Sequence, residues 1–174
     1  MKKTLLLVVV LVLCAGRSVH ADMKVGIVDL MKTLNESDSG KKAKSDLEVL
    51  IKSKQSVLDE KGKEIEKLKA DLEKQSSVLS AGAKKAKEDE LEKLLREYQR
   101  LVGDSQSEVK KRESDLTGEI LKEIRAIVDK MGEDGGYTMI LENAEGLVLY
   151  SKKEINLTDA LIKKYNESKA KNKK

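Results

Sequence analysis

One stretch, residues 41–131, constrains the fold more than any other part of the chain. It contains no proline, and charged side chains occupy nearly every second position. Apolar residues recur in it at intervals of seven, first at Ile51, Leu58, Ile65, Leu72 and Leu79, then at Leu95, Val102, Val109 and Leu116. This spacing is the heptad pattern of helices that pack along a narrow apolar seam. We therefore predict that residues 41–131 are helical.

The companion row of the heptad pattern is only partly apolar. It starts each half with leucine or tyrosine, but it also holds Lys54, Lys61, Gln75, Ser105 and Arg112. Polar side chains at these positions predict a loosely filled seam. Because a helix with so narrow a seam is marginal in water by itself, each helix must pack on the other or on a second chain.

The pattern is interrupted at residues 80–83, where Gly82 can adopt the left-handed backbone that ends helices. We predict an antiparallel hairpin of two helices, 41–79 and 83–131, about 58 and 73 Å long, with its tip near residues 80–84. The alternative is one uninterrupted helix in a parallel coiled coil, because a single glycine costs only about 1 kcal/mol. Gly62, Gly103 and Gly118 are further weak points, consistent with arms that bend and equally with drift on a tolerant surface.

Residues 1–21 have the pattern of a cleaved signal peptide. Lys2 and Lys3 precede the apolar run 5–13, and a small-residue cleavage site ends at Ala21. The run is too short to span a bilayer, which takes about 20 residues. Cys14 leaves lipid attachment as an alternative, although such sites normally have a small residue where this chain has Leu13. The pattern predicts export of the chain across a membrane, with cleavage after Ala21.

Loss of the signal changes the charge and the available chemistry. It removes three of the 35 basic residues and none of the 31 acidic ones, which leaves a net charge of +1 instead of +4. A nucleic-acid partner is not expected at this charge. The single cysteine, Cys14, and the single histidine, His20, also leave, so catalytic triads and the usual zinc sites are excluded. We predict no enzyme activity, no metal and no cofactor.

The two ends of the chain are predicted to form one small body from residues 22–40 and 132–174. The N-terminal part reads as a strand at 23–29, a short helix at 30–34 capped by Asp29, and a cap for the long helix at Ser37 or Ser39.

The C-terminal part reads as a hairpin of strands 137–141 and 147–150. A final helix follows, capped by Asn156 or Thr158, and the chain from Lys163 onward is expected to fray.

Three short strands cannot bury much apolar surface, and their edges stay open. We therefore predict that several copies join their strands in one oligomerisation body from which the helical hairpins project. The fold class is α+β and mainly helical. The residues assigned to the body interface are Val25, Ile27, Val28, Met139, Ile140, Leu141, Leu147, Val148 and Leu149.

The order of these segments resembles the Skp/OmpH family of periplasmic chaperones. The resemblance lies in residues 24–29 (KVGIVD), which are followed by residues 30–37, and in residues 137–141, 146–150 and 156–159. It implies a homotrimer in the periplasm, with a β-rich body and three helical tentacles. The tentacles enclose a cavity that holds unfolded outer-membrane proteins without ATP.

The resemblance also implies a basic tip on each tentacle. Residues 74–87 contain four lysines and no acid. We assign client contact to the tip and inner face of the arm and name Lys74, Val78, Leu79, Lys84, Lys85 and Lys87 for it. Anionic lipid headgroups and lipopolysaccharide are further candidate partners of these lysines, although the lipopolysaccharide-contact pattern of some members has no convincing match here. The alternative function is a structural envelope scaffold or spacer with one tight partner, and the loosely filled seam favours the chaperone.

Overall fold

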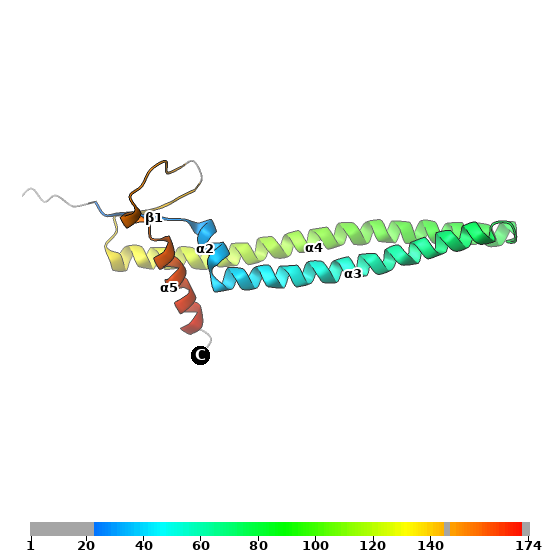
Figure 1. Ribbon diagram of the computed structural model, residues 1–174, viewed down its shortest axis with the longest axis horizontal. Helices are drawn as coiled ribbons and strands as arrows, with labels where there is room; N and C mark the ends of the chain where they lie inside the picture. Colours follow the sequence, from blue (N-terminus) through cyan, green and yellow to red (C-terminus); the bar gives the residue numbers. More distant parts are fainter. Residues whose placement is uncertain (1–22, 145–146, 172–174) are drawn as a thin grey trace, which may run out of the picture.

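The computed structural model describes residues 23–144 and 147–171, so the predicted signal peptide and Cys14 lie outside the described residues. Two long helices, α3 (Asp38–Gln75) and α4 (Ala81–Gly135), lie side by side and antiparallel (Figure 1). We call residues 45–115 the arm and the other described residues the base. The base also contains β1 (Val25–Val28), α2 (Leu30–Glu36), β2 (Met139–Glu142), the short 3₁₀ helix η1 (Lys153–Ile155) and α5 (Thr158–Lys171). The predicted fold class, α+β and mainly helical, is confirmed.

Two polar contacts define how the two helices of the arm are aligned. Lys54 Nζ lies 2.6 Å from Glu108 Oε2, and Lys87 Nζ donates to Gln75 Oε1 at 3.2 Å. In each pair the two residue numbers add up to 162, so each step forward along α3 is matched by one step back along α4. The alignment of the two helices therefore does not shift between these two contacts. The predicted antiparallel hairpin is therefore confirmed, and the alternative of one uninterrupted helix is excluded.

The chain reverses without the glycine that was predicted to reverse it. Helix α4 begins at Ala81, and the Ser80 hydroxyl caps it by accepting from the Ala83 N–H at 3.3 Å. Gly82 therefore lies in the first turn of α4 and has no positive φ. That prediction was wrong because a serine cap starts a helix without any left-handed residue. The left-handed glycine is Gly136, which ends α4 at φ 62°.

The sheet of the base differs from the predicted hairpin. Strand β2 pairs in parallel with β1, with Val25 opposite Met139 and Ile27 opposite Leu141. Residues 147–150 form no strand. Alternating apolar residues indicate extended segments but not their partners. Here the backbone at both ends of β2 bonds to β1, through Thr138 N to Lys24 O and Asn143 N to Val28 O.

One core joins the two ends of the chain to the last turns of α4. Ile120, Ile124 and Met131 of α4 are buried against side chains from β1, α2 and α5, namely Val28, Leu30, Leu34, Leu161 and Tyr165. The apolar stripe of α4 broadens at this end, because here the helix packs against several elements and not against α3 alone.

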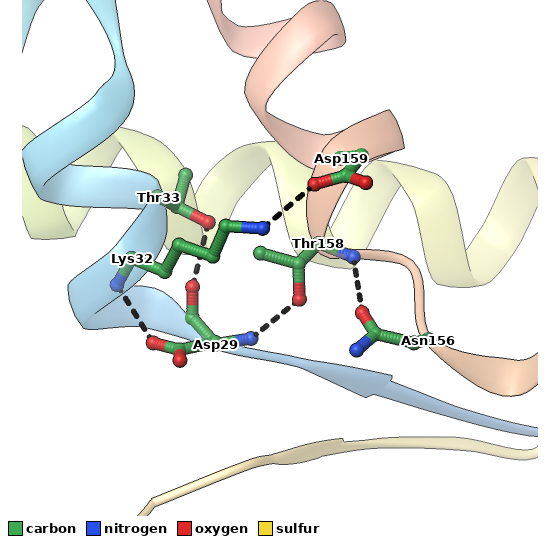
Figure 2. A network of polar contacts seen from close by, with 6 residues as sticks. All are labelled: Asp29, Lys32, Thr33, Asn156, Thr158 and Asp159. Carbon is green, nitrogen blue, oxygen red and sulfur yellow. Dashed lines mark hydrogen bonds and ion pairs between the residues drawn. The ribbon is translucent and has the colours of Figure 1, made fainter. Parts of the chain in front are cut away.

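A polar network fastens the start of α2 to the start of α5 (Figure 2). Asp29 caps α2 by accepting from the Lys32 N–H at 2.7 Å, as predicted, and its own N–H donates to Thr158 Oγ1 at 3.0 Å. Lys32 Nζ forms an ion pair with Asp159 Oδ1 at 3.0 Å. Asn156 Oδ1 accepts from the Thr158 N–H at 2.9 Å. Residues more than 120 positions apart in sequence are thereby joined at one point.

Candidate functional site

The tip of the arm, residues 74–87, carries the six residues assigned to client contact. The Val78 side chain is 81% exposed, Leu79 is partly buried, and Lys74 and Lys85 are exposed. Two of the lysines have partners: Lys84 Nζ lies 3.9 Å from Glu88 Oε1, and Lys87 donates to Gln75. The tip therefore presents one apolar side chain among cations, of which Lys74 and Lys85 form no ion pair with the described residues.

Within the two helices of the arm, the exposed large apolar residues all belong to α3. Val49 is 66% exposed, Ile51 46% and Val57 43%, whereas no large apolar side chain of the described α4 residues reaches comparable exposure. The arm therefore offers weak apolar contacts on one of its two helices. The predicted client-contact surface included the inner face of the arm in general terms, but these three side chains were not named in it.

Ile51 also belongs to a groove where the arm joins the base. The groove encloses about 400 Å³, and its apolar lining is Leu34, Ala43, Leu47, Ile51, Leu116 and Ile120. Lys44, Glu48 and Glu113 are among the polar residues that line it. Sequence reasoning missed this groove because it forms between α2, α3 and α4, and heptad spacing describes only the contact between α3 and α4.

The polar positions of the arm seam have two kinds of partner. Lys54 and Gln75 bond across the hairpin to Glu108 and Lys87. Lys61 instead pairs with Glu64 of its own helix at 2.6 Å, and the hydrogen bond and charge of Glu64 raise the pKa of Lys61. The predicted loosely filled seam therefore needs refinement, because some of its polar residues link the two helices.

The sheet of the base has two unlike faces. Because successive side chains of a strand point to opposite faces, Val28 and Ile140 lie on the face that packs into the core. Val25, Ile27, Met139 and Leu141 lie on the other face. There Ile27 is buried, but Met139 and Leu141 are 43% and 42% exposed. This outer face is apolar and incompletely covered, and β2 has one edge without a partner among the described residues.

The segment after β2 adds more exposed apolar surface to the base. Leu147 is 67% exposed, Leu149 93% and Tyr150 83%, while Val148 is partly buried. Side chains of this size rarely remain this exposed in a row on a monomer. Met23 and Met31 are also exposed, and sequence reasoning did not assign them to any surface.

Helix α5 is fastened to α4 by a carboxylate that accepts from two side chains. Tyr165 donates its hydroxyl to Glu123 Oε2 at 2.6 Å, and Lys169 Nζ lies 2.6 Å from Glu123 Oε1. Burial and the hydrogen bond to Glu123 raise the pKa of Tyr165 to about 12. Burial of Glu123 opposes its ionisation, but the bonds from Lys169 and Tyr165 together lower its pKa. Helix α5 continues to Lys171, so the predicted fraying was wrong for residues 163–171, and residues 172–174 lie outside the described residues.

The described residues bring together no group of His, Cys, Asp or Glu that could hold a metal ion. None of the helices in the described ranges is both long and apolar enough to cross a membrane. The arrangement offers surfaces for contact, and the pattern of exposed apolar and basic side chains is its main chemical feature.

These features define a class of protein in which a small base of helices and strands carries one long, charged arm of two helices. The outer face of the sheet in the base is apolar and only partly covered. The chain belongs to the OmpH-like family, because the family model for outer membrane proteins (OmpH-like) matches residues 24–165. This confirms the family that the sequence resembles.

The fold is also similar to a crystal structure of an OmpH-like protein from Caulobacter crescentus CB15. The two chains are 16% identical, and the match has a TM-score of 0.79 and covers 84% of this chain and 85% of that one. A search of curated proteins finds no match to the chain. At this identity the likeness establishes the fold alone.

Proposed function

We propose that this protein is an ATP-independent holdase chaperone of the periplasm. In this proposal three copies associate through their bases, and their arms surround a cavity that holds unfolded outer-membrane proteins and prevents their aggregation. No step requires catalysis or a cofactor. Membership of the OmpH-like family is the observation that carries the proposal, and the Caulobacter protein of the same fold is itself a proposed outer membrane chaperone.

The arm supports a holding function through many weak contacts. Val49, Ile51 and Val57 expose apolar surface at intervals along α3, and Val78 does so at the tip. No single site of this kind binds tightly, but several sites on tethered arms raise the overall affinity. The dense charge on both helices keeps a complex soluble, and the lysines of the tip attract acidic client segments or anionic headgroups over a range limited by salt.

The base supports self-association through its uncovered apolar surface. Met139 and Leu141 on the outer sheet face, the open edge of β2 and the exposed segment 147–150 are all features that a second copy would cover. We propose that residues 147–150, which have no strand partner within the described chain, pair with another copy. The assembled body would then contain more strand than one chain does alone.

Aggregation of denatured clients tests the holding function. Micromolar protein without nucleotide should suppress light scattering by several unrelated denatured outer-membrane proteins. Replacing Val78 with serine should weaken suppression more than replacing Val49, which is similarly exposed but lies away from the tip. Suppression of no client would favour the scaffold alternative, and equal effects of the two variants would remove the tip from the proposal.

A second pair of variants tests whether the positive charge of the tip contributes to client binding. Exchanging the four tip lysines for glutamine should reduce client affinity most at low salt. The same charge change on exposed lysines in the middle of α3 should have a smaller effect, and the control residues are Lys52, Lys63, Lys67 and Lys69. Titration with vesicles of zwitterionic or anionic lipid, and with lipopolysaccharide, then separates the candidate anionic partners.

Native mass measurement tests assembly separately from client binding. The unmodified protein should have the mass of three chains. Replacing both Met139 and Leu141 with lysine should give single chains, because two cations would then lie in the apolar interface. Replacing Val49 with lysine in the arm serves as the control and should leave the trimer intact. If the unmodified protein has the mass of a single chain, the proposal of a cavity between several arms is contradicted.

A further inference from the structure

The two ends of the arm carry net charges of opposite sign. The tip, residues 74–87, contains four lysines and no acid, which gives a net charge of +4. The inner part of the arm, residues 45–60 and 102–115, contains eight acidic and five basic residues, which gives a net charge of −3. The whole arm, with 17 acidic and 16 basic residues, is nearly neutral. The charge of the arm is therefore polarised along its length.

The groove where the arm joins the base combines this negative charge with an apolar surface. Glu48 of α3 and Glu113 of α4 both line the groove, and because residue numbers across the hairpin add up to 162, they lie within one residue of the same level. Both side chains are exposed, and neither forms an ion pair with the described residues. Lys44 is the one cation in the lining. Two carboxylates without an ion-pair partner thus flank an apolar groove.

The tip has the complementary construction. Val78 is 81% exposed, and the partly buried Leu79 follows it. Lys74 and Lys85 are exposed and form no ion pair with the described residues. The groove encloses about 400 Å³, which is large enough for one valine side chain and its neighbour. An apolar side chain between cations therefore matches an apolar groove between carboxylates.

The tip cannot reach the groove of its own arm. Lys74 lies 26 residues along α3 from Glu48, which corresponds to about 39 Å. Copies that join through their bases and project their arms together hold their tips equally far from every groove. The occupant must therefore be the tip of a separate molecule. Two arms placed side by side and antiparallel bring each tip to the other's groove, because the same span separates tip and groove in both.

From this match we propose that two molecules dock reciprocally, with the tip of each arm seated in the groove of the other. Val78 enters the apolar part of the groove. The two unpaired lysines of the tip lie against Glu48 and Glu113. Because the contact has two-fold symmetry, it is made twice, and the first contact raises the effective concentration for the second.

Docking has a consequence for the proposed holding function. It covers Val78 at the tip and Ile51 in the groove, which both expose apolar surface on the isolated arm. A client and a second molecule then compete for the same surfaces, so docked molecules are a reserve from which clients release the arms. The docking itself depends neither on client binding nor on the number of copies that the bases join.

Sedimentation velocity of the purified protein measures docking. At low salt, a rise in protein concentration should double the mass of the assembly that is present at high salt. High salt should weaken docking by about tenfold, because it screens four exposed ion pairs. Val78→Ser should weaken each of the two contacts by about tenfold, the factor for returning one valine side chain to water. Absence of doubling at every concentration, or doubling that does not respond to salt, would overturn the proposal.

Charge reversal on each surface identifies the contact. E48K/E113K and K74E/K85E should each abolish doubling, because tip and groove then have the same sign of charge. All four side chains are exposed, so the changes leave the fold intact, and circular dichroism checks this. A mixture of the two variants should restore doubling. The unchanged tip of the first variant meets the unchanged groove of the second, and the two reversed surfaces meet each other.

A matched control separates this contact from a general effect of charge. E66K/D104K makes the same change in net charge at exposed positions in the middle of the arm, and it should double in mass like the unmodified protein. Loss of doubling in this control, or no restoration on mixing, would contradict the proposal. So would a groove that binds a lysine-flanked apolar peptide while the protein never doubles, because the groove would then belong to clients alone. No client is present in these measurements, so the aggregation experiments succeed or fail independently of them.

Discussion

The base and the arm are built from similar residue types but are stabilised in different ways. In the base, Ile124 and Leu161 are fully buried and Tyr165 is 1% exposed. In the described arm only Ile65 and Ser105 are buried to a comparable degree. A base residue therefore has neighbours from several elements, whereas an arm residue has one partner helix and solvent. The same substitution should consequently have different effects in the two regions.

Removal of a large apolar side chain should show the largest difference. Ile124→Ala should lower the free energy of unfolding by about 4 kcal/mol, because it leaves a cavity among well-packed side chains. Ile51→Ala in the arm should cost only about 1 kcal/mol, since Ile51 is already 46% exposed. Urea denaturation at one fixed protein concentration measures both. Similar losses would show that the arm is as tightly packed as the base.

Glycine replacement should change sign between the two regions. Gly40→Ala should destabilise the protein by about 3 kcal/mol, because the new methyl group collides with the Leu34 carbonyl oxygen. Gly62→Ala should stabilise it by up to about 1 kcal/mol through helix propensity. Thermal unfolding of the two single variants is a direct comparison. A stabilising Gly40→Ala would show that the backbone can move away from the Leu34 carbonyl oxygen at little cost.

The link between α4 and α5 predicts a pH dependence of the base. The pKa of Tyr165 is raised from 10.0 to about 12, so its contribution is complete below pH 10 and is lost as the pH rises toward 12. The lowered pKa of Glu123 gives a contribution that is present above its ordinary value of 4.5 and is lost as the pH falls through the folded value.

Tyr165→Phe tests the alkaline part of this dependence. It should cost about 1–2 kcal/mol at pH 7, in the range for a hydrogen bond to a charged group, and it should flatten the loss of stability between pH 10 and 12. Tyr98→Phe is the control, since Tyr98 lies in the arm seam and forms no side-chain hydrogen bond with the described residues. An unchanged alkaline profile in Tyr165→Phe would exclude Tyr165 as its cause.

The smallest effect is expected for the ion pair across the arm. Lys54→Ala or Glu108→Ala should each change stability by about 0.5 kcal/mol, because the Glu108 side chain is 56% exposed and solvent screens the pair. A double-mutant cycle at low and high salt measures the coupling between the two residues. A coupling well above 1 kcal/mol would show that this pair is a main support of the arm.

Much of this architecture could be predicted from the sequence, and the errors have physical causes. Heptad spacing predicted the hairpin. The Asp29 cap was predicted, and Ser37 was one of two candidate caps, because capping depends on a few adjacent residues. The pairing of β2 with β1 could not be predicted, since strand pairing depends on residues more than 100 positions apart. The groove where the arm joins the base was also missed, because three helices contribute to it.

The constant alignment of α3 with α4 restricts how the length of the arm can change. Inserting one residue in α3 alone would rotate every later side chain by about 100° and separate Gln75 from Lys87. Growth or shortening that preserves the seam must come in matched heptads, seven residues in each helix, and each such step changes the reach by about 10.5 Å. The span of this protein can therefore be set in steps, by gene duplication or by design, without altering a residue of the base.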